Sequence, residues 1–337
     1  MKIPRNKLVG FAAATAAAAL LLSGCSASGS DSSSEGGEQA SGELTQVTLA
    51  INPSSQSAPL YYGLQEGIFA DHGIDLEIVP QTDVAAIVSG VASGQYDFGF
   101  GTVVHVINAN LGGIPLRAVA TVEGQQKDHE EPEEGNALVA APGSGVTSAG
   151  DLEGKTLAVV GLASLNTFAA YNLIDNAGGD PSQVELVQLP FGQMPAALSS
   201  GDVDAAVIQA PFIGEATALG GTIIGKPNVE TFPNMAVGLY TTTQSFIDQN
   251  EDVVKAFSDA VVASQLAASE NVDGARMTLV ENLGITEEAA MAALWNTDSN
   301  PYVNVEGFET AQDLLIRFGD QTEELDVNEL VWPGALE

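Results

Sequence analysis

The sequence predicts an α/β protein built as two similar lobes, and three observations lead to that prediction. Segments with strand and helix patterns alternate along most of the chain, as they do in mostly parallel sheets covered by helices. Two segments 107 positions apart, 91–100 and 198–207, repeat one pattern: an apolar helical end, Ser-Gly, two further residues, an Asp and an apolar strand. A polar stretch over 123–135 interrupts the alternation between them.

Each repeat marks a corner where a helix ends and a buried strand begins. Gly94 and Gly201 stand at the position just past a helix that favours a left-handed residue. Asp97 and Asp204 follow three residues later, immediately before the strand. We interpret the two corners as equivalent points of two lobes, which leave a cleft between them as the candidate binding site.

The first lobe opens with a predicted strand over 47–51. Ser57 is placed to cap the helix that follows, and Leu60, Leu64 and Ile68 share one face of that helix. The other predicted elements of this lobe are strands at 74–79, 98–100 and 116–122, a helix capped by Asp83 and closed by Gly94, and a helix over 101–111 that ends at Gly112 and Gly113.

The second lobe repeats the alternation after the polar stretch. Its predicted elements are strands at 137–141, 156–160, 184–189 and 205–208 and helices at 165–176, 193–199 and 211–219. A strand over 235–241 then returns the chain to the first lobe, and helices follow at 251–270, 272–282, 287–295 and 306–318. We therefore predict one lobe from 44–122 and 239–337 and the other from 123–238.

The N-terminus has the pattern of an export signal. Three basic residues precede an apolar stretch over 8–22, which is short for a membrane span. The Leu-Ser-Gly-Cys sequence that ends at Cys25 resembles the cleavage box of bacterial lipoproteins, in which the cysteine receives lipid. We predict a signal peptide over 1–24 and, because 25–43 is rich in Ser, Gly and acidic residues with no apolar run, a flexible tether after it.

Composition and motifs narrow the classes of function. The formal net charge of −34 disfavours nucleic acid and anionic lipid surfaces as partners, and a single cysteine, Cys25, allows no internal disulfide. No nucleophile elbow, dinucleotide motif or phosphate loop occurs. His72 and His105 are interpreted as structural or solvated. The acidic segment 128–134 lacks the regular spacing of a calcium loop. From these observations together we expect no catalytic residue, no metal and no cofactor.

Small polar and aromatic side chains follow the predicted strands, at the edge where open parallel sheets bind ligands. Helix N-termini at this edge offer unpaired N–H groups, and plain helix capping is the alternative role of each polar residue. Glu123 follows the strand 116–122 at the predicted first hinge. If its carboxylate faces the ligand, it accepts a hydrogen bond from an amino group or a protonated ring nitrogen; the alternative is a solvated hinge carboxylate. The predicted substrate-binding residues are Asn52, Gln56, Ser57, Tyr61, Gly101, Thr102, Glu123, Ser164, Asn166, Thr167, Gln193, Gln209 and Phe212.

Several segments together resemble the solute-binding proteins of the nitrate/sulfonate/taurine and thiamine-precursor family. They are 58–69, 72–78, 93–99, 113–119, 151–159, 200–206 and 250–257, within a resemblance that covers about residues 45–330. The resemblance implies a two-lobed periplasmic-binding-protein fold of type II. In that fold each lobe is a mostly parallel sheet flanked by helices, two hinge strands join the lobes, and the ligand cleft lies between them.

The resemblance also implies a function. The chain would be an extracytoplasmic substrate-binding protein that captures a small organic solute and delivers it to the permease of an ABC importer, acting as a monomer. Lipid on Cys25 would hold it at the outer face of the cell membrane. Two other classes stay open. One is an enzyme of the same fold, although the synthases of this family carry a Cys-rich motif and this chain has no cysteine after Cys25. The other is a lipoprotein sensor or adhesion module.

The basic residues give an expectation for the charge of the substrate. Oxyanion-binding members are expected to offer Lys or Arg as well as helix N-termini. None of the seven basic residues after Cys25 falls at a predicted cleft loop. This favours a neutral or cationic heteroaromatic compound, such as a thiamine-pyrimidine precursor, over sulfonates, taurine or nitrate, which remain the alternative.

Lipid attachment at Cys25 can be tested in cells. We expect Cys25→Ala to abolish lipid labelling and to leave the protein unprocessed or released into the medium, because the acylated sulfur is lost. Metabolic labelling with a fatty-acid analogue measures this. A Cys25→Ala protein that is still labelled would rule out the assignment.

Overall fold

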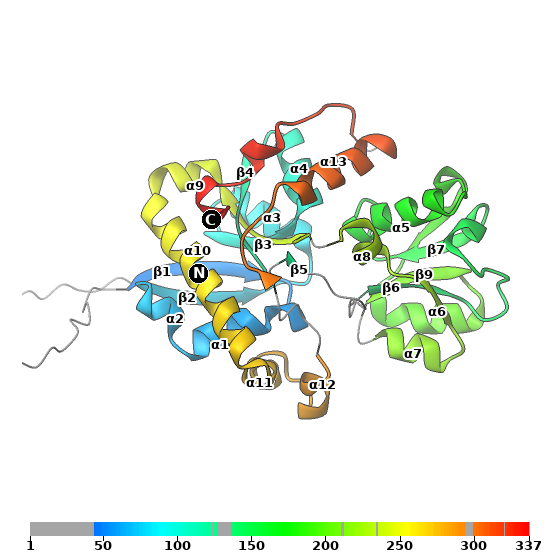
Figure 1. Ribbon diagram of the computed structural model, residues 1–337, viewed down its shortest axis with the longest axis horizontal. Coiled ribbons are helices and arrows are strands. Elements are labelled where there is room, and N and C mark those ends of the chain that lie inside the picture. Colours follow the sequence, from blue (N-terminus) through cyan, green and yellow to red (C-terminus); the bar gives the residue numbers. More distant parts are fainter. Residues whose placement is uncertain are drawn as a thin grey trace, which may run out of the picture. The chain divides into compact units, whose positions relative to one another are not determined.

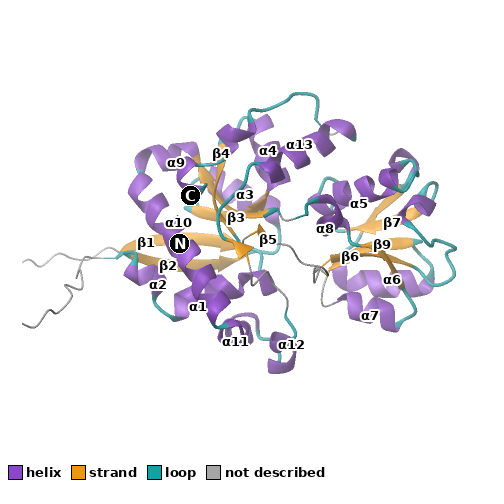
Figure 2. Cartoon of the chain, viewed as in Figure 1, coloured by secondary structure: helices purple, strands orange, loops and turns teal. Residues whose placement is uncertain are grey.

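The computed structural model describes residues 44–122, 125–126, 136–209, 212–233, 235–293, 299–319 and 321–336. These residues form two five-stranded sheets, each flanked by helices (Figures 1 and 2). The predicted signal peptide, the tether over 25–43 and most of the polar stretch 123–135 lie outside the described residues.

The first sheet has the strand order β2-β1-β3-β11-β4. Its strands are β1 (Thr45–Ile51), β2 (Ile74–Pro80), β3 (Phe98–Thr102), β4 (Leu116–Thr121) and β11 (Gly238–Thr243). β1 pairs in parallel with β2 and β3, whereas β11 is antiparallel to both β3 and β4. Four strands of this sheet therefore run in one direction, and β11 is reversed.

The second sheet repeats this plan, with the order β10-β6-β9-β7-β8. Its strands are β6 (Asn136–Ala140), β7 (Thr156–Val159), β8 (Glu185–Gln188), β9 (Ala205–Gln209) and β10 (Thr222–Gly225). β7 is parallel to β8 and β9, and β6 is antiparallel to β9 and β10. Here β6 is the reversed strand and holds the position that β11 holds in the first sheet. The prediction of mostly parallel sheets is confirmed.

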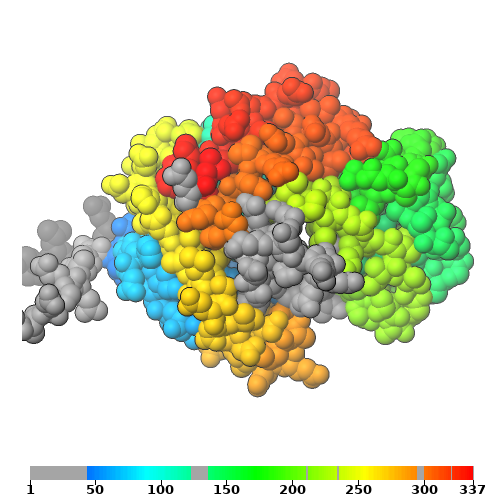
Figure 3. Space-filling view, in the orientation of Figure 1, coloured from blue at the N-terminus to red at the C-terminus, as the bar shows by residue number. Residues whose placement is uncertain are grey.

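Helices of the first and last parts of the chain cover the first sheet, and those in between cover the second. The first group is α1 (Ala58–Gln65), α2 (Ile68–Asp71), α3 (Val84–Ala92), α4 (Val103–Leu111), α9 (Gln244–Gln249), α10 (Glu251–Glu270), α11 (Val272–Leu283), α12 (Glu287–Met291) and α13 (Glu306–Arg317). The second group is α5 (Leu165–Asn176), α6 (Met194–Ser200), α7 (Phe212–Ala218) and α8 (Pro227–Thr231). In Figure 3 the yellow surface of α10 lies directly beside the blue N-terminal segments, which agrees with the packing of α10 on α1.

Two close contacts hold the core of the first sheet together. The rings of Phe98 in β3 and Phe257 in α10 stack with their centroids 4.0 Å apart. On the other face of β3, a Cβ on Gly99 would lie 2.6 Å from side-chain atoms of both Ile87 and Val91. Glycine at this position therefore lets α3 pack directly on the strand, and a larger residue would push the helix away.

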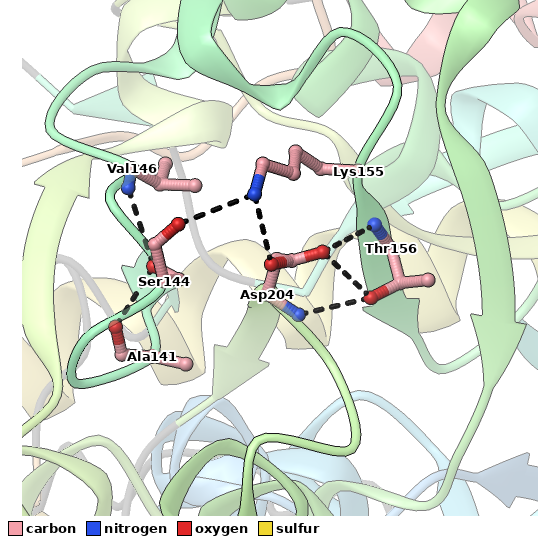
Figure 4. Close-up of polar contacts among 6 residues, drawn as sticks. All are labelled: Ala141, Ser144, Val146, Lys155, Thr156 and Asp204. Atoms are coloured by element: carbon pink, nitrogen blue, oxygen red, sulfur yellow. Dashed lines mark hydrogen bonds and ion pairs between the residues drawn. The ribbon is translucent and has the colours of Figure 1, made fainter.

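The two corners that the sequence repeats fold into the same set of hydrogen bonds. Asp97 Oδ2 accepts from the backbone N–H and the hydroxyl of Thr48, both at 2.8 Å, and the Asp97 N–H donates to Thr48 Oγ1 at 3.0 Å. Asp204 makes the same three bonds with Thr156, at 2.9, 3.0 and 3.0 Å (Figure 4). We call each set an Asp–Thr clamp. Each clamp joins the start of one strand to the neighbouring parallel strand.

The second clamp is extended by a cation. Lys155 Nζ lies 3.3 Å from Asp204 Oδ1 and donates to the carbonyl of Ser144 at 3.2 Å (Figure 4). Burial alone would raise the pKa of the Asp204 carboxyl. The hydrogen bonds from Thr156 and the ion pair with Lys155 outweigh burial and hold that pKa below its ordinary value of 3.8.

The glycine positions before both clamps are confirmed as left-handed. Gly94 has φ of 74° and Gly201 has φ of 77°, each just after a helix that ends at the repeated Ser-Gly. A residue with a Cβ would be strained at either position.

Several sequence predictions need correction. The predicted helix through Leu64 and Ile68 is two helices, because Gly67 has φ of 77° and ends α1, and Leu64 is 38% exposed instead of buried. β10, α8 and α9 were not predicted from the sequence. The residues of β10 are exposed or only half-buried, so they lack the apolar run of a buried strand. α12 ends at Met291, four residues before the predicted end.

Loss of either clamp should lower the stability of the protein by a similar amount. We expect Asp97→Ala and Asp204→Ala each to lower the free energy of unfolding by about 1.5–3 kcal/mol, since each removes hydrogen bonds to a charged group. Urea unfolding followed by circular dichroism measures this. Asp75→Ala is the control, because Asp75 is an exposed residue of β2, and its effect should stay within about 0.5 kcal/mol. Equal effects of the three substitutions would contradict a structural role for the clamps.

Candidate functional site

The carboxyl ends of the parallel strands of the first sheet meet at one edge. β1 pairs with β3 through Leu49–Phe98 and Ala50–Gly99, so Asn52 after β1 lies on the same side as Gly101 and Thr102 at the end of β3. The same edge includes the start of the reversed strand, because Thr102 pairs with Gly238 of β11. Asn52 is half-buried, and its Nδ2 donates to the carbonyl of Thr82 at 3.2 Å.

Thr102 and His105 form a polar pair at the start of α4. Thr102 stands at the N-cap position of the helix without capping it, and its Oγ1 lies 2.8 Å from His105 Nδ1. Burial holds the pKa of His105 below its ordinary value of 6.5, and the opposing influence of the Asp83 carboxylate is smaller. The imidazole is therefore neutral at pH 7. The sequence analysis interpreted His105 as structural or solvated, although the spacing Thr102-x-x-His105 places the two side chains one helical turn apart.

The residues around the start of α1 are more buried than a ligand contact requires. Ser57 is 2% exposed and Tyr61 is 4% exposed, and burial raises the pKa of the Tyr61 hydroxyl above its ordinary value of 10.0. The predicted cap by Ser57 is wrong. A 3₁₀ turn, η1 (Ser55–Ser57), comes before α1 and gives Ser57 a helical conformation (φ −80°, ψ −2°), whereas a capping side chain needs extended backbone. Gln56 lies in η1 and is half-buried.

In the second sheet the candidate residues of α5 take part in local structure. Ser164 Oγ accepts from the N–H of Thr167 at 3.3 Å and lies 3.0 Å from its Oγ1. Thr167 is fully buried and donates to the carbonyl of Gly161 at 2.6 Å. Asn166 Oδ1 accepts from Asn228 Nδ2, at 3.1 Å, across the packing of α5 on α8. Ser164 and Thr167 therefore hold the turn between β7 and α5, and Asn166 is held toward α8.

The remaining candidates separate onto the two faces of the second sheet. Gln209 ends β9 opposite Asn136, which begins β6. Phe212 packs on the other face, against the apolar cluster of α6 and α7. Its ring lies close to Gly192, since a Cβ added to that glycine would be 3.4 Å from the ring. Gln193 is exposed before α6. Of the predicted site residues, Asn52, Gly101, Thr102 and Gln209 thus lie at the carboxyl edges of the two sheets. Two asparagines that were not predicted lie beside such residues, because Asn136 pairs with Gln209 and Asn228 bonds to Asn166. Glu123 and Cys25 lie outside the described residues.

The sequence of this chain also matches a known protein family. The profile of a family described as NMT1/THI5 like matches residues 54–275, about two thirds of the chain. The chain belongs to the NMT1/THI5-like family.

Relatives of the chain carry two kinds of name. A formylaminopyrimidine-binding protein of Halalkalibacterium halodurans is 28% identical over 165 residues, 49% of this chain and 47% of its own length. The taurine-binding periplasmic protein of Escherichia coli is 26% identical over 236 residues, 68% of this chain and 69% of its own. A 4-amino-5-hydroxymethyl-2-methylpyrimidine phosphate synthase of Legionella pneumophila is 26% identical over 147 residues, 43% of each. The chain thus spans about half the length of the first of these relatives.

Solved structures show the fold. The ligand-binding component of an ABC-type import system from Staphylococcus aureus has a TM-score of 0.70 at 15% identity, covering 87% of this chain and 98% of that one. The periplasmic nitrate-binding protein NrtA of Synechocystis has a TM-score of 0.69 at 14% identity and covers 86% of each chain. The NMT1/THI5-like chain therefore has the type II periplasmic-binding-protein fold that the sequence analysis expected.

A cation does lie at the carboxyl edge of this NMT1/THI5-like protein. Lys226 stands directly after β10, a strand that the sequence analysis missed, and its backbone N–H donates to Glu230 Oε1 at 2.6 Å. Arg117 and Lys155 lie at the opposite edges, near the starts of β4 and β7. An anionic substrate is therefore compatible with the charge at this edge.

Other kinds of site were also sought in the described residues. They contain no group of three His, Cys, Asp or Glu side chains placed to hold a metal ion. No helix within the described ranges is both long and apolar enough to cross a membrane. A hollow of about 500 Å³ lies beside Tyr171, Asp175 and Arg317, near the C-terminal end of α5. It is at the opposite end of α5 from Ser164 and so does not belong to the candidate site.

The neutral state of His105 leads to a prediction about pH. Its lowered pKa means that the unfolded chain binds a proton near pH 6.5 while the folded chain does not, so stability is full above pH 6.5 and falls as the pH drops toward the folded pKa. NMR of the imidazole should place its titration midpoint below 6.5. His105→Gln should lose less stability than the parent between pH 7 and pH 5. A midpoint at or above 6.5 would contradict the buried position.

Proposed function

We propose that this chain is an extracytoplasmic substrate-binding protein that captures a small organic solute and delivers it to an ABC importer. The observation that carries the proposal is the repetition of the site. Two sheets of matching order carry polar side chains at or just after the ends of parallel strands, Asn52 and Thr102 in one sheet and Gln209 in the other. Two similar polar edges suit a solute held between two lobes, and both the relatives and the fold support this role.

The proposed lobes follow the sheets. We assign 44–122 and 239–337 to one lobe and 123–238 to the other, and the two segments that join the sheets act as hinges. The proposed substrate-binding residues remain those of the sequence analysis, with Glu123 at the first hinge. The protein is proposed to act as a monomer, held at the outer face of the cell membrane by lipid on Cys25 after removal of residues 1–24.

The proposed solute is a thiamine-pyrimidine-type or other heteroaromatic compound. A relative that binds formylaminopyrimidine supports this class, as do the neutral amide and hydroxyl groups at both edges. A sulfonate or related anion is the second candidate, favoured by Lys226 at the carboxyl edge and by the taurine-binding relative. We propose binding without catalysis, although relatives named as synthases share part of the sequence.

Solute binding should close the two lobes. We expect the radius of gyration, measured by small-angle X-ray scattering, to fall when a saturating formylaminopyrimidine is added to the purified protein, because hinged lobes close around their ligand. The compound should be recovered unchanged by mass spectrometry. Conversion to a new product would point to the enzyme class. A bound solute with an unchanged radius would rule out hinge closure.

A further inference from the structure

One buried polar atom of the second sheet has no partner within the described structure. Asn136 is 5% exposed, and its Oδ1 makes no hydrogen bond. A buried oxygen of this kind costs free energy in the unliganded protein, because it gives up water without gaining a donor. Buried oxygens without a donor are uncommon. A ligand that supplies the missing donor would account for this one.

The position of Asn136 is the carboxyl edge of the proposed site. It begins β6 and pairs with Gln209, the last residue of β9. Side chains alternate along a strand, and Leu138 belongs to the buried cluster of α5, whereas Ala137 belongs to the cluster of α6 and α7. Asn136 therefore faces the α5 side of the sheet, where α5 and α8 lie together (Figure 1).

Other carboxamides lie on the same side. Asn166 near the start of α5 and Asn228 near the start of α8 are hydrogen-bonded to each other at 3.1 Å. Asn166 thus has a described donor for its amide oxygen, whereas Asn136 has none. Of these two residues, Asn136 is therefore the one whose hydrogen bonding a solute can complete.

We infer that Asn136 Oδ1 accepts a hydrogen bond from an N–H group of the transported solute, and that the solute therefore carries an amine or amide at that point. The inference rests on the proposed function and narrows it. An aminopyrimidine or an ammonium group satisfies the oxygen, whereas nitrate has no N–H to offer. Asn136 is a specificity-determining residue in this view, because a solute without a donor leaves the oxygen unpaired.

Two substitutions separate this role from a structural one. Asn136→Leu removes the acceptor and fills a similar volume, and Asn136→Asp keeps an acceptor of the same shape. We expect Asn136→Leu to leave the melting temperature of the unliganded protein unchanged or higher, because the unpaired oxygen is gone. The same variant should bind its solute about threefold to tenfold more weakly, the value of one neutral hydrogen bond. Asn136→Asp should bind within about threefold of the parent or more tightly.

Isothermal titration calorimetry of the full-length protein with formylaminopyrimidine, taurine and nitrate tests the inference. The matched control is Gln183→Leu, an amide-to-leucine change at an exposed residue just before β8, on the opposite edge of the sheet, which should not alter affinity. Asn136→Leu that binds as well as the parent overturns the inference and leaves the proposed function standing. Preferential binding of nitrate, or loss of binding in Asn136→Asp, also overturns it. A parent that binds none of the three solutes overturns the proposed function and the inference together.

Discussion

The Asp–Thr clamp is the contact on which both sheets depend. A shift of one residue between paired strands would turn every buried side chain to the wrong face. Each clamp fixes the pairing, because the backbone N–H and the hydroxyl of one threonine both donate to the same aspartate. The backbone carbonyls of the same aspartates also accept hydrogen bonds from the reversed strand or the residue just after it. Thr242 Oγ1 donates to the carbonyl of Asp97 at 2.7 Å, and the N–H of Ala141 donates to the carbonyl of Asp204 at 2.8 Å. One residue in each sheet thus orders three adjacent strands.

The clamps also explain which parts of the structure the sequence predicts well. The repeated Ser-Gly-x-x-Asp pattern is local, so the two corners follow from the chain itself. The bounds of α5 and α10 are the ones predicted from the sequence, 165–176 and 251–270. β10 was not predicted because its residues are exposed or half-buried and lack an apolar run. Its strand conformation depends instead on the pairing with β6. The geometry of Ser57 depends on a 3₁₀ turn that no sequence signal marks.

The candidate site was less predictable than the fold for a related reason. Predicting it required knowing which side chains keep their hydrogen-bonding groups for a ligand, and this is a property of the folded neighbourhood. Ser164 and Thr167 have the residue types of ligand contacts yet bond to each other. Asn136 and His105 carried no motif, and their roles arise from burial. The clamps stand at the amino ends of their strands, away from the candidate site, so residues that identify the family say little about its solutes.

The reversed strand of the first sheet determines which sheet has all of its strands first as the chain emerges. The second sheet is made from one continuous stretch, Asn136–Gly225, whereas the first needs β11 at Gly238–Thr243 between β3 and β4. On a chain that emerges from its N-terminus, all strands of the second sheet are therefore available before β11 can complete the first. Until then β3 and β4 keep open edges, which are surfaces for unwanted pairing with other chains. The sheet whose synthesis begins first is thus the sheet that can be completed only last.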